Sequence, residues 1–218
     1  MKGIFSFSFT TCPSTVRASS LSEGNSAMKA FMRRALLCVG ALFLTLAGLF
    51  PMTAVAALPP DLENTLWLDL PAGRVVIKLR PDLAPHHVAR IKELARQGFY
   101  DGLAFHRVIP GFMAQTGDPR GDGTGGSGQK LKAEFSKELH LRGTVSMARA
   151  TNPDSADSQF FICFAPAPYL DGQYTVWGDV VSGMEAVDEI KKGSSSNNGT
   201  VSDPTRIIHL RVAADVKS

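Results

Sequence analysis

The chain has 218 residues, a formal net charge of +3 at pH 7 and a hydrophobic content of 44%. Five of its 23 Lys and Arg residues but only one of its 20 Asp and Glu residues precede residue 57, which leaves 18 basic and 19 acidic residues in the rest of the chain. That nearly neutral remainder of about 160 residues argues against a nucleic-acid partner and is long enough for one domain with a single core.

Residues 28–56 have the organisation of an export signal. Three basic residues within 29–34 precede an apolar run over 35–50, and Ala54-Val55-Ala56 is a small-residue cleavage pattern. We therefore predict a signal peptide over 28–56 and a mature protein that starts near Ala57 in the periplasm. An uncleaved inner-membrane anchor is the main alternative, because the apolar run is slightly long for a signal peptide and short for a spanning helix.

Residues 1–27 lack an organised charge pattern and are rich in Ser and Thr. We interpret them as an N-terminal extension that is untranslated or disordered, with translation starting at Met28 or Met32. An organellar transit sequence in front of an export signal would have a similar composition and stays open as an alternative.

The first predicted elements of the domain are two short strands and a helix. Strands are expected at 65–70 and 74–79, because both runs are rich in β-forming residues and a Pro-Ala-Gly turn separates them. A helix follows, beginning at Pro85 and ending near Gly98, with apolar residues at helical spacing between them. The further expected strands are 105–108, 112–116, 144–148, 160–164, 175–180 and 206–212.

A second, shorter helix is expected over 184–190, ahead of a polar loop at 193–199. Many short strands with only two helices favour an antiparallel barrel or sandwich over an α/β sheet. Of the three cysteines, Cys12 and Cys38 precede the predicted cleavage site. Cys163 therefore has no disulfide partner in the mature domain, and its apolar neighbours predict a packed core thiol.

Two ordered runs of residues stand out in the predicted domain. The first, over 105–118, reads FHRVIPGFMAQTGD and places one arginine and one glutamine among apolar side chains around a Pro-Gly turn. The second combines SMARA at 146–150, SQFFIC at 158–163 and LDG at 170–172. Together these runs resemble the motifs of the cyclophilin-type peptidyl-prolyl isomerases, and the resemblance extends over residues 63–214.

The resemblance implies a mainly β isomerase domain over residues 57–218, of the bacterial exported type. Its fold would be a closed eight-stranded antiparallel β-barrel capped by two α-helices. The interior of such a barrel is packed with side chains. The working groove is therefore expected on the outer surface of a monomer that acts on proline-containing polypeptides.

The resemblance makes Arg107 the catalytic residue. Rotation about the peptide bond before proline must break amide resonance, at a barrier of about 18–20 kcal/mol. In the twisted transition state the prolyl nitrogen regains a lone pair, so a donor aimed at it binds the transition state better than the substrate. An arginine suits this role because it is permanently charged and donates from a rigid planar group. No covalent step, metal or cofactor is needed.

The resemblance also assigns an apolar pocket that holds the proline ring. The residues assigned to it are Phe112, Met113, Phe161 and Leu170, with Tyr174 at the edge. Other substrate-binding residues on the same grounds are Gln115, Ala148, Arg149, Ala150, Gln159 and Tyr169.

Three positions depart from the family pattern. Tyr169 stands where animal cyclophilins have a tryptophan that helps to hold cyclosporin, which predicts weak binding of that drug. Tyr174 replaces a histidine, and Arg149 replaces an asparagine whose contact with substrate is largely through its backbone. Catalysis should therefore tolerate Arg149, whereas the substrate preference of this chain need not match that of the animal proteins.

A simple hairpin would not bring the site residues together. If Pro110-Gly111 is a two-residue turn, Arg107 pairs with Ala114 and shares a face with Phe112, while Gln115 points to the other face. A bulge, a strong local twist or a different register is then required.

Two other patterns in the sequence are set aside. Gly121, Gly123 and Gly126 satisfy G-x-G-x-x-G, but they lack the context of a phosphate loop and are interpreted as a loop bordering the groove. The histidines show no metal-ligand spacing. The histidines are His86, His87, His106, His140 and His209.

Two functional hypotheses follow. The first is an exported peptidyl-prolyl isomerase that speeds the folding of other exported proteins, whose proline-limited steps take roughly tens of seconds unaided. The second is a holdase or scaffold that binds proline-containing segments, with catalysis incidental. The presence of Arg107 favours the enzyme, because a binding groove alone has no use for a donor matched to the twisted state.

Overall fold

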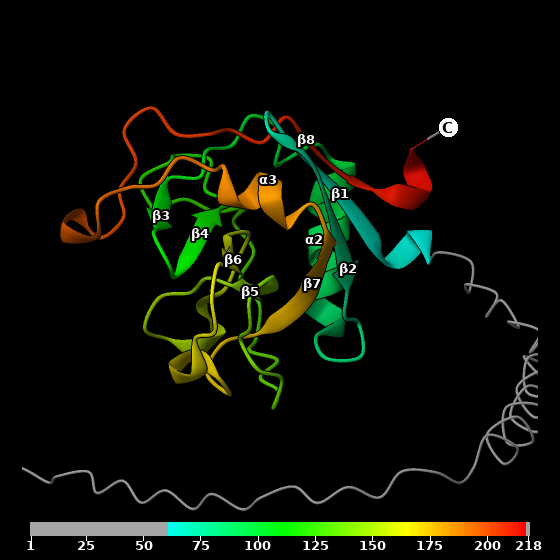
Figure 1. The fold of residues 1–218 in the computed structure, drawn as a ribbon. Helices are drawn as coiled ribbons and strands as arrows, with labels where there is room; N and C mark the ends of the chain where they lie inside the picture. Colours follow the sequence, from blue (N-terminus) through cyan, green and yellow to red (C-terminus); the bar gives the residue numbers. More distant parts are fainter. Residues whose placement is uncertain (1–60, 217–218) are drawn as a thin grey trace, which may run out of the picture. The chain divides into compact units, whose positions relative to one another are not determined.

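Eight strands form one antiparallel sheet in the computed structural model, which describes residues 61–216 (Figure 1). The strands are β1 (Thr65–Leu70), β2 (Gly73–Leu79), β3 (Arg107–Ile109), β4 (Met113–Thr116), β5 (Thr144–Met147), β6 (Phe160–Cys163), β7 (Val176–Ser182) and β8 (His209–Val212). Their order across the sheet is β3-β4-β6-β5-β7-β2-β1-β8. The two α-helices are α2 (Pro85–Arg96), which lies against β8, and α3 (Met184–Asp188), which lies against β2. The predicted extension and signal peptide, residues 1–56, lie outside the described residues.

The mainly β class is confirmed, and every predicted strand and helix is present with small shifts at its ends. The largest shift is in the last strand, which begins at His209 and not at 206. Arg206 instead forms a single isolated bridge with Ala104.

The predicted closed barrel is wrong, because the sheet is an open, curled half-barrel whose edge strands β3 and β8 do not pair with each other. The free edge of β3 is taken by an irregular segment. The amide of Val108 donates to the carbonyl of Gly199 at 2.7 Å, and its carbonyl accepts from the amide of Gly193 at 2.9 Å. This segment satisfies the backbone groups that a closing strand would have paired, so a ladder to β8 is not required.

The inner face of the sheet carries the main hydrophobic core. Along β1, residues 66, 68 and 70 are buried and their neighbours are partly exposed, which is the period-two pattern of a sheet with one covered face. The largest buried rings meet edge to face: Phe160 lies 5.6 Å from Tyr100 and 5.4 Å from Trp177 between ring centroids. These rings fill the interior, so any substrate groove must lie outside it.

Helix α2 is capped by a distant loop. Its N-cap residue, Ala84, has no side-chain hydrogen bond to the helix. Glu134 replaces that cap, because its carboxylate accepts the backbone amides of His86 at 3.1 Å and His87 at 3.0 Å. A negative charge is favoured at a helix N-terminus. The contact ties the 129–142 segment, which leads into β5, to the helix.

A second, smaller apolar cluster lies on the outer face of β4 and β6. It consists of Met113, Phe161, Cys163, Ala167 and Leu170. Because side chains alternate along a strand, the residues between them, such as Ala114 and Ile162, belong to the main core. Cys163 is fully buried, and burial raises the pKa of its thiol to about 12, which confirms the predicted packed thiol.

We expect Phe160→Ala to destabilise the domain by about 3–5 kcal/mol, because it removes a fully buried ring from between two others. Total stabilities of domains are typically about 5–15 kcal/mol, so the midpoint of urea unfolding should fall strongly. Leu139→Ala is the control, since that side chain is 52% exposed. Equal effects of the two changes would contradict this description of the core.

Candidate active site

The turn between β3 and β4 decides which residues face one another. The amide of Phe112 donates to the carbonyl of Ile109 at 3.1 Å, and Gly111 has φ of 71°. Proline followed by a residue with positive φ is the signature of a type II turn, which only glycine or asparagine adopts readily. Three residues therefore separate the strands, and Arg107 pairs with Gln115. The two-residue hairpin considered from the sequence, with Arg107 opposite Ala114, does not form; of the alternatives named there, the structure has the different register.

This register places a row of side chains across three strands. Arg107 on β3 is opposite Gln115 on β4, which is opposite Phe161 on β6. Directly opposite residues share a face of the sheet. The outer face thus carries a cation, an amide and an aromatic ring side by side.

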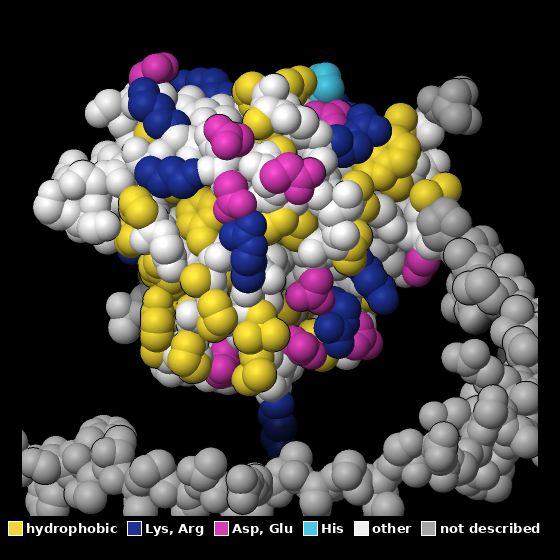
Figure 2. Space-filling view, viewed as in Figure 1, with side chains coloured by type: hydrophobic (Ala, Val, Ile, Leu, Met, Phe, Trp, Pro, Cys, Tyr) yellow, Lys and Arg dark blue, Asp and Glu magenta, His cyan; other side chains and the backbone are white. Residues whose placement is uncertain are grey.

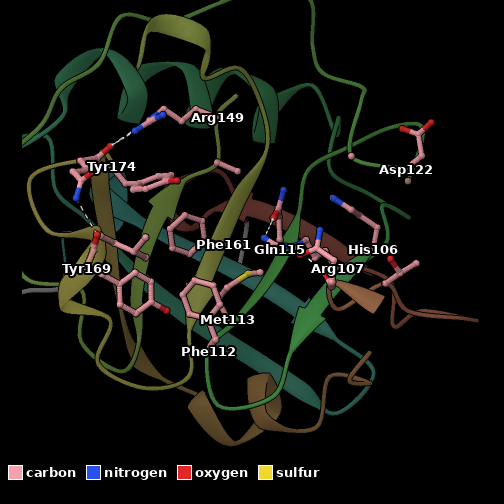
Figure 3. Close-up of a pocket in the computed structure, with 17 residues that line it drawn as sticks. His106, Arg107, Phe112, Met113, Gln115, Asp122, Arg149, Phe161, Tyr169 and Tyr174 are labelled. Atoms are coloured by element: carbon pink, nitrogen blue, oxygen red, sulfur yellow. Dashed lines mark hydrogen bonds between the residues drawn. The ribbon is translucent and has the colours of Figure 1, made fainter. Parts of the chain in front are cut away.

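A cleft of about 650 Å³ opens above this row (Figure 3). The predicted site residues that line it are Arg107, Phe112, Met113, Gln115, Ala148, Arg149, Phe161, Tyr169, Leu170 and Tyr174. The remaining two, Ala150 and Gln159, line a neighbouring hollow of about 280 Å³ that shares Gln115 with the cleft. The structure therefore places all the predicted residues in two adjoining hollows.

The apolar half of the cleft has a floor of buried side chains. Met113 and Phe161 are 1% and 5% exposed, and Leu170 is 7% exposed. The ring of Phe161 meets that of Tyr174 edge to face at 5.9 Å. Figure 3 shows Phe112, Met113 and Phe161 lying together, with Gln115 and Arg107 beside them. A ring-sized apolar group would be desolvated here.

The polar half of the cleft is built around the guanidinium of Arg107. Its Nε donates to the backbone carbonyl of Asn198 at 3.0 Å, Nη2 donates to Oδ1 of the same residue at 2.9 Å, and Nη1 donates to Oε1 of Gln115 at 3.1 Å. All these acceptors are neutral, and Arg107 forms no ion pair within residues 61–216. Partial burial lowers the pKa of Arg107, yet an arginine keeps its proton at neutral pH.

A chain of amides extends this polar half into the glycine-rich loop. Nε2 of Gln115 donates to Oε1 of Gln159 at 2.9 Å, and Nε2 of Gln159 donates to the carbonyls of Gly123 and Gly125 at 3.0 and 2.8 Å. Each amide presents its oxygen toward Arg107 and its nitrogen away from it. The chain therefore holds the carbonyl of Gln115 in place as an acceptor for the guanidinium.

The glycine-rich loop, residues 117–128, is held by buried carboxylates. Asp118, which is 1% exposed, accepts the backbone amides of Arg120, Asp122 and Gly123. Asp157 accepts that of Ser127 at 2.6 Å. Gly121 and Gly123 line the cleft, so the loop borders the groove as the sequence predicted.

Arg149 forms the far rim of the cleft. Its guanidinium lies 4.5 Å from the centroid of the Tyr174 ring and donates to the carbonyl of Gln173 at 2.9 Å. This is a cation–π contact with a backbone anchor. The two residues that depart from the family pattern at these positions therefore pack against each other.

Comparisons with known proteins agree on one family. A protein-family model described as "Cyclophilin type peptidyl-prolyl cis-trans isomerase/CLD" matches residues 65–212. A Brucella suis protein named a probable peptidyl-prolyl cis-trans isomerase is 55% identical over 199 residues, covering 86% of this chain and 99% of that protein. Peptidyl-prolyl cis-trans isomerase B of Bacillus subtilis is 47% identical over 123 residues, covering 56% of this chain and 85% of that protein. The chain belongs to the cyclophilin-type peptidyl-prolyl isomerases.

Solved cyclophilins have a similar fold. A cyclophilin from Hirschia baltica matches with a TM-score of 0.64 at 26% identity, covering 72% of this chain and 76% of that one. A cyclophilin-type isomerase from Cryptosporidium parvum, crystallised in the presence of the dipeptide Ala-Pro, matches with a TM-score of 0.63 at 29% identity, covering 68% of this chain and 98% of that one. The protein whose structure is described above is thus a cyclophilin, an enzyme that catalyses cis–trans isomerisation of the peptide bond before proline.

Sequence reasoning missed several residues that line the cleft of this cyclophilin. The most important is Asn198, which holds Arg107 from a loop 91 residues further along the chain. The Asn-Gly pair at 198–199 is a sequence signal for a tight turn, and Asn198 has φ of 50° in the structure, but nothing in the sequence linked that turn to Arg107. The other missed lining residues are His106, Asp122, Gln173 and Thr200, whereas Gly121 and Gly123 belong to the loop that was predicted to border the groove.

We expect Asn198→Gly to lower kcat/KM about three- to tenfold, because the arginine keeps its charge and loses the side-chain acceptor that orients it. Glycine tolerates the left-handed backbone at this position, so the loop should keep its path. Asn197→Gly, an exposed change in the same loop, is the control. A tetrapeptide isomerisation assay measures both, and an unchanged kcat/KM for the Asn198 variant would contradict the role given to this contact.

Two buried histidines should make this cyclophilin sensitive to acid. Burial lowers the pKa of His87 and of His106 below the ordinary value of 6.5, because the charged ring would lose its hydration. The unfolded chain then binds protons at a higher pH than the fold does. The free energy of unfolding should therefore fall as the pH drops through about 6.5, and the loss should end below the folded-state pKa values.

Urea unfolding at a series of pH values between about 5 and 8 measures this loss. Over the range in which the protein stays folded, kcat/KM should not follow the same curve, since Arg107 does not titrate there. A stability that is constant across that range would refute the assignment of neutral, buried histidines.

Proposed function

We propose that this cyclophilin accelerates isomerisation by donating a hydrogen bond from Arg107 to the prolyl nitrogen of the twisted amide. The observation that carries the proposal is that the guanidinium of Arg107 is held in place without an ion pair within the described part of the chain. It is held at one end by neutral acceptors, has no neutralising carboxylate among residues 61–216, and borders an apolar pocket. A partly desolvated cation with unused N–H groups forms a stronger hydrogen bond to the prolyl lone pair there than it would in water.

The substrate we propose is a polypeptide with proline in the apolar half of the cleft. The Cryptosporidium parvum relative crystallised in the presence of Ala-Pro supports a proline ligand for the family. The ring would occupy the pocket of Phe112, Met113, Phe161 and Leu170. Gln115 and the backbone around Arg149 would hold the main chain, so that rotation is confined to one peptide bond.

Export to the periplasm is part of the proposal. The signal-like pattern of residues 28–56 supports it. The match to the Brucella suis protein covers 86% of this chain. Residues 65–218, which contain the whole family domain, are a smaller share of the 218 residues than that, so the match also includes residues before 65. Within residues 61–216, the structure contains no helix with the length and hydrophobicity to span a membrane.

The exposed ring of Tyr169 supports weak binding of cyclosporin. Tyr169 is 61% exposed, and its ring centroid lies 5.5 Å from that of Phe112 at the mouth of the cleft. A tyrosine offers less apolar area there than the tryptophan of animal cyclophilins. We also propose that the protein works as a monomer, because one chain supplies every residue of the groove.

We expect Arg107→Ala to lower kcat about 10² to 10³-fold, the range found for removal of a preorganised donor. Arg107→Lys should recover only part of that loss, because an ammonium group lacks the planar geometry that holds the guanidinium in place. The assay is the cis–trans isomerisation of a short peptide, together with the refolding of a protein limited by proline. Near-normal rates in the alanine variant would favour the alternative hypothesis of a holdase, and unchanged suppression of aggregation by that variant would support it.

The expected mature N-terminus is near Ala57, in protein released with the periplasmic fraction. N-terminal sequencing of the protein recovered from cells, combined with fractionation, measures the cleavage site and the location together. An intact N-terminus that stays with the membrane fraction would instead establish the uncleaved anchor.

A further inference from the structure

A strip of exposed apolar side chains lies beside the cleft. Its members, called here the apolar shelf, are Leu139, Leu141, Pro166, Pro168 and Tyr169. The two leucines are 52% and 50% exposed. Figure 2 shows apolar side chains gathering on the surface below β5 and β6. A contiguous patch of exposed apolar side chains marks an interaction surface more often than scattered exposed apolar residues do.

The shelf is held in place from below by His140. This residue is 1% exposed; its backbone amide and Nδ1 meet Oδ1 of Asp171 at 2.8 and 2.9 Å, and its carbonyl accepts the amide of Ala167 at 2.8 Å. These bonds join the 139–141 segment to both ends of the 168–170 turn. Because His140 points inward, its neighbours Leu139 and Leu141 are left outside. The backbone of the leucines is thus held while about half of each leucine stays exposed, and little ordering is needed when they bind.

The shelf is continuous with the cleft. Tyr169 belongs to both, and its ring packs against that of Phe112, which also lines the cleft. None of the shelf residues is charged, and the nearest arginine in sequence, Arg142, is paired with Asp188 at 2.5 Å and bonded to a backbone carbonyl. The nearest carboxylates, Glu138 and Asp171, are likewise engaged, with Arg80 and His140. A chain that leaves the cleft past Tyr169 therefore meets an apolar surface whose neighbouring charges are paired.

We propose that the apolar shelf binds an extended apolar stretch of the same unfolded polypeptide whose proline occupies the cleft. This inference rests on the function proposed for the cleft. The continuity through Tyr169 argues for such a ligand, because a polypeptide held at its proline must cross the rim. Apolar contact is non-directional, so the shelf would accept many sequences. Unfolded chains expose such stretches, and native proteins bury them.

The test compares two double variants of the full protein as purified from cells. Leu139→Gln with Leu141→Gln removes the apolar area of the shelf. Val181→Gln with Ile208→Gln is the matched control. Val181 lies on β7 and is 59% exposed, and Ile208 directly precedes β8 and is 47% exposed. All four side chains are exposed, so the substitutions should have little effect on folding.

Two substrates separate the shelf from the cleft. With a short proline-containing tetrapeptide, we expect both double variants to match the wild type. With an unfolded, reduced and alkylated protein whose refolding is limited by proline, we expect KM to rise about five- to tenfold in the shelf variant with kcat unchanged, from the loss of two partly buried leucine contacts. The control variant should keep the wild-type KM. An unchanged KM in the shelf variant, or an equal rise in the control, would overturn the proposal.

A binding measurement keeps this inference distinct from the proposed catalytic function. A proline-free apolar peptide, titrated into ¹⁵N-labelled protein, should shift the backbone amide signals of residues 139 and 141 in the wild type, and those of the same positions should not move in the shelf variant. That result is expected even if the wild type proves inactive on the tetrapeptide, which would refute the catalytic proposal alone. Absence of these shifts would overturn the shelf as a polypeptide site. So would a wild-type dimer in light scattering that is lost in the shelf variant, because that result would assign the shelf to binding another copy of the chain.

Discussion

The pairing register of β3, β4 and β6 is the constraint on which the site depends. Because side chains alternate along a strand, a slip of one residue would turn Gln115 or Phe161 into the main core and leave Arg107 without neighbours. The type II turn at Pro110-Gly111 sets this register on one side, and the packing of alternate residues into two separate clusters sets it on the other. The geometry proposed for catalysis is therefore a consequence of strand pairing, and the loops add to it.

The second requirement, set by the mechanism proposed for Arg107, is a cation that is positioned without being neutralised. A carboxylate beside Arg107 would hold it more strongly, but would compete with the weak acceptor that appears on the prolyl nitrogen. Neutral carbonyl and amide oxygens from Asn198 and Gln115 fix the guanidinium in direction while leaving its charge available. The amide chain through Gln159 then carries this orientation to a loop that is itself anchored on buried carboxylates.

Much of the fold could be predicted from the sequence, because its signals are local. Short runs of β-forming residues between turn signals indicated the strands, and Pro85 and Gly98 bracketed the first helix. Closure of the barrel was predicted wrongly, since it depends on which distant segment satisfies the edge of β3. That edge is taken by backbone groups of residues 193–199, which are polar, irregular and without strand periodicity. No local pattern in those residues indicates that they would occupy a sheet edge.

What the sequence by itself determined was the chemistry available: an arginine, a glutamine and apolar rings in two motifs, sufficient to indicate the family and the reaction. Only the tertiary structure decided how these groups are held, because the contact of Arg107 with Asn198 joins positions 91 residues apart. The same holds for the shelf, where leucines that would ordinarily be expected in a core stay outside because His140 takes the inward position between them. Residue types are a local property of the chain, whereas the neighbours that orient or expose them depend on the path of the whole backbone.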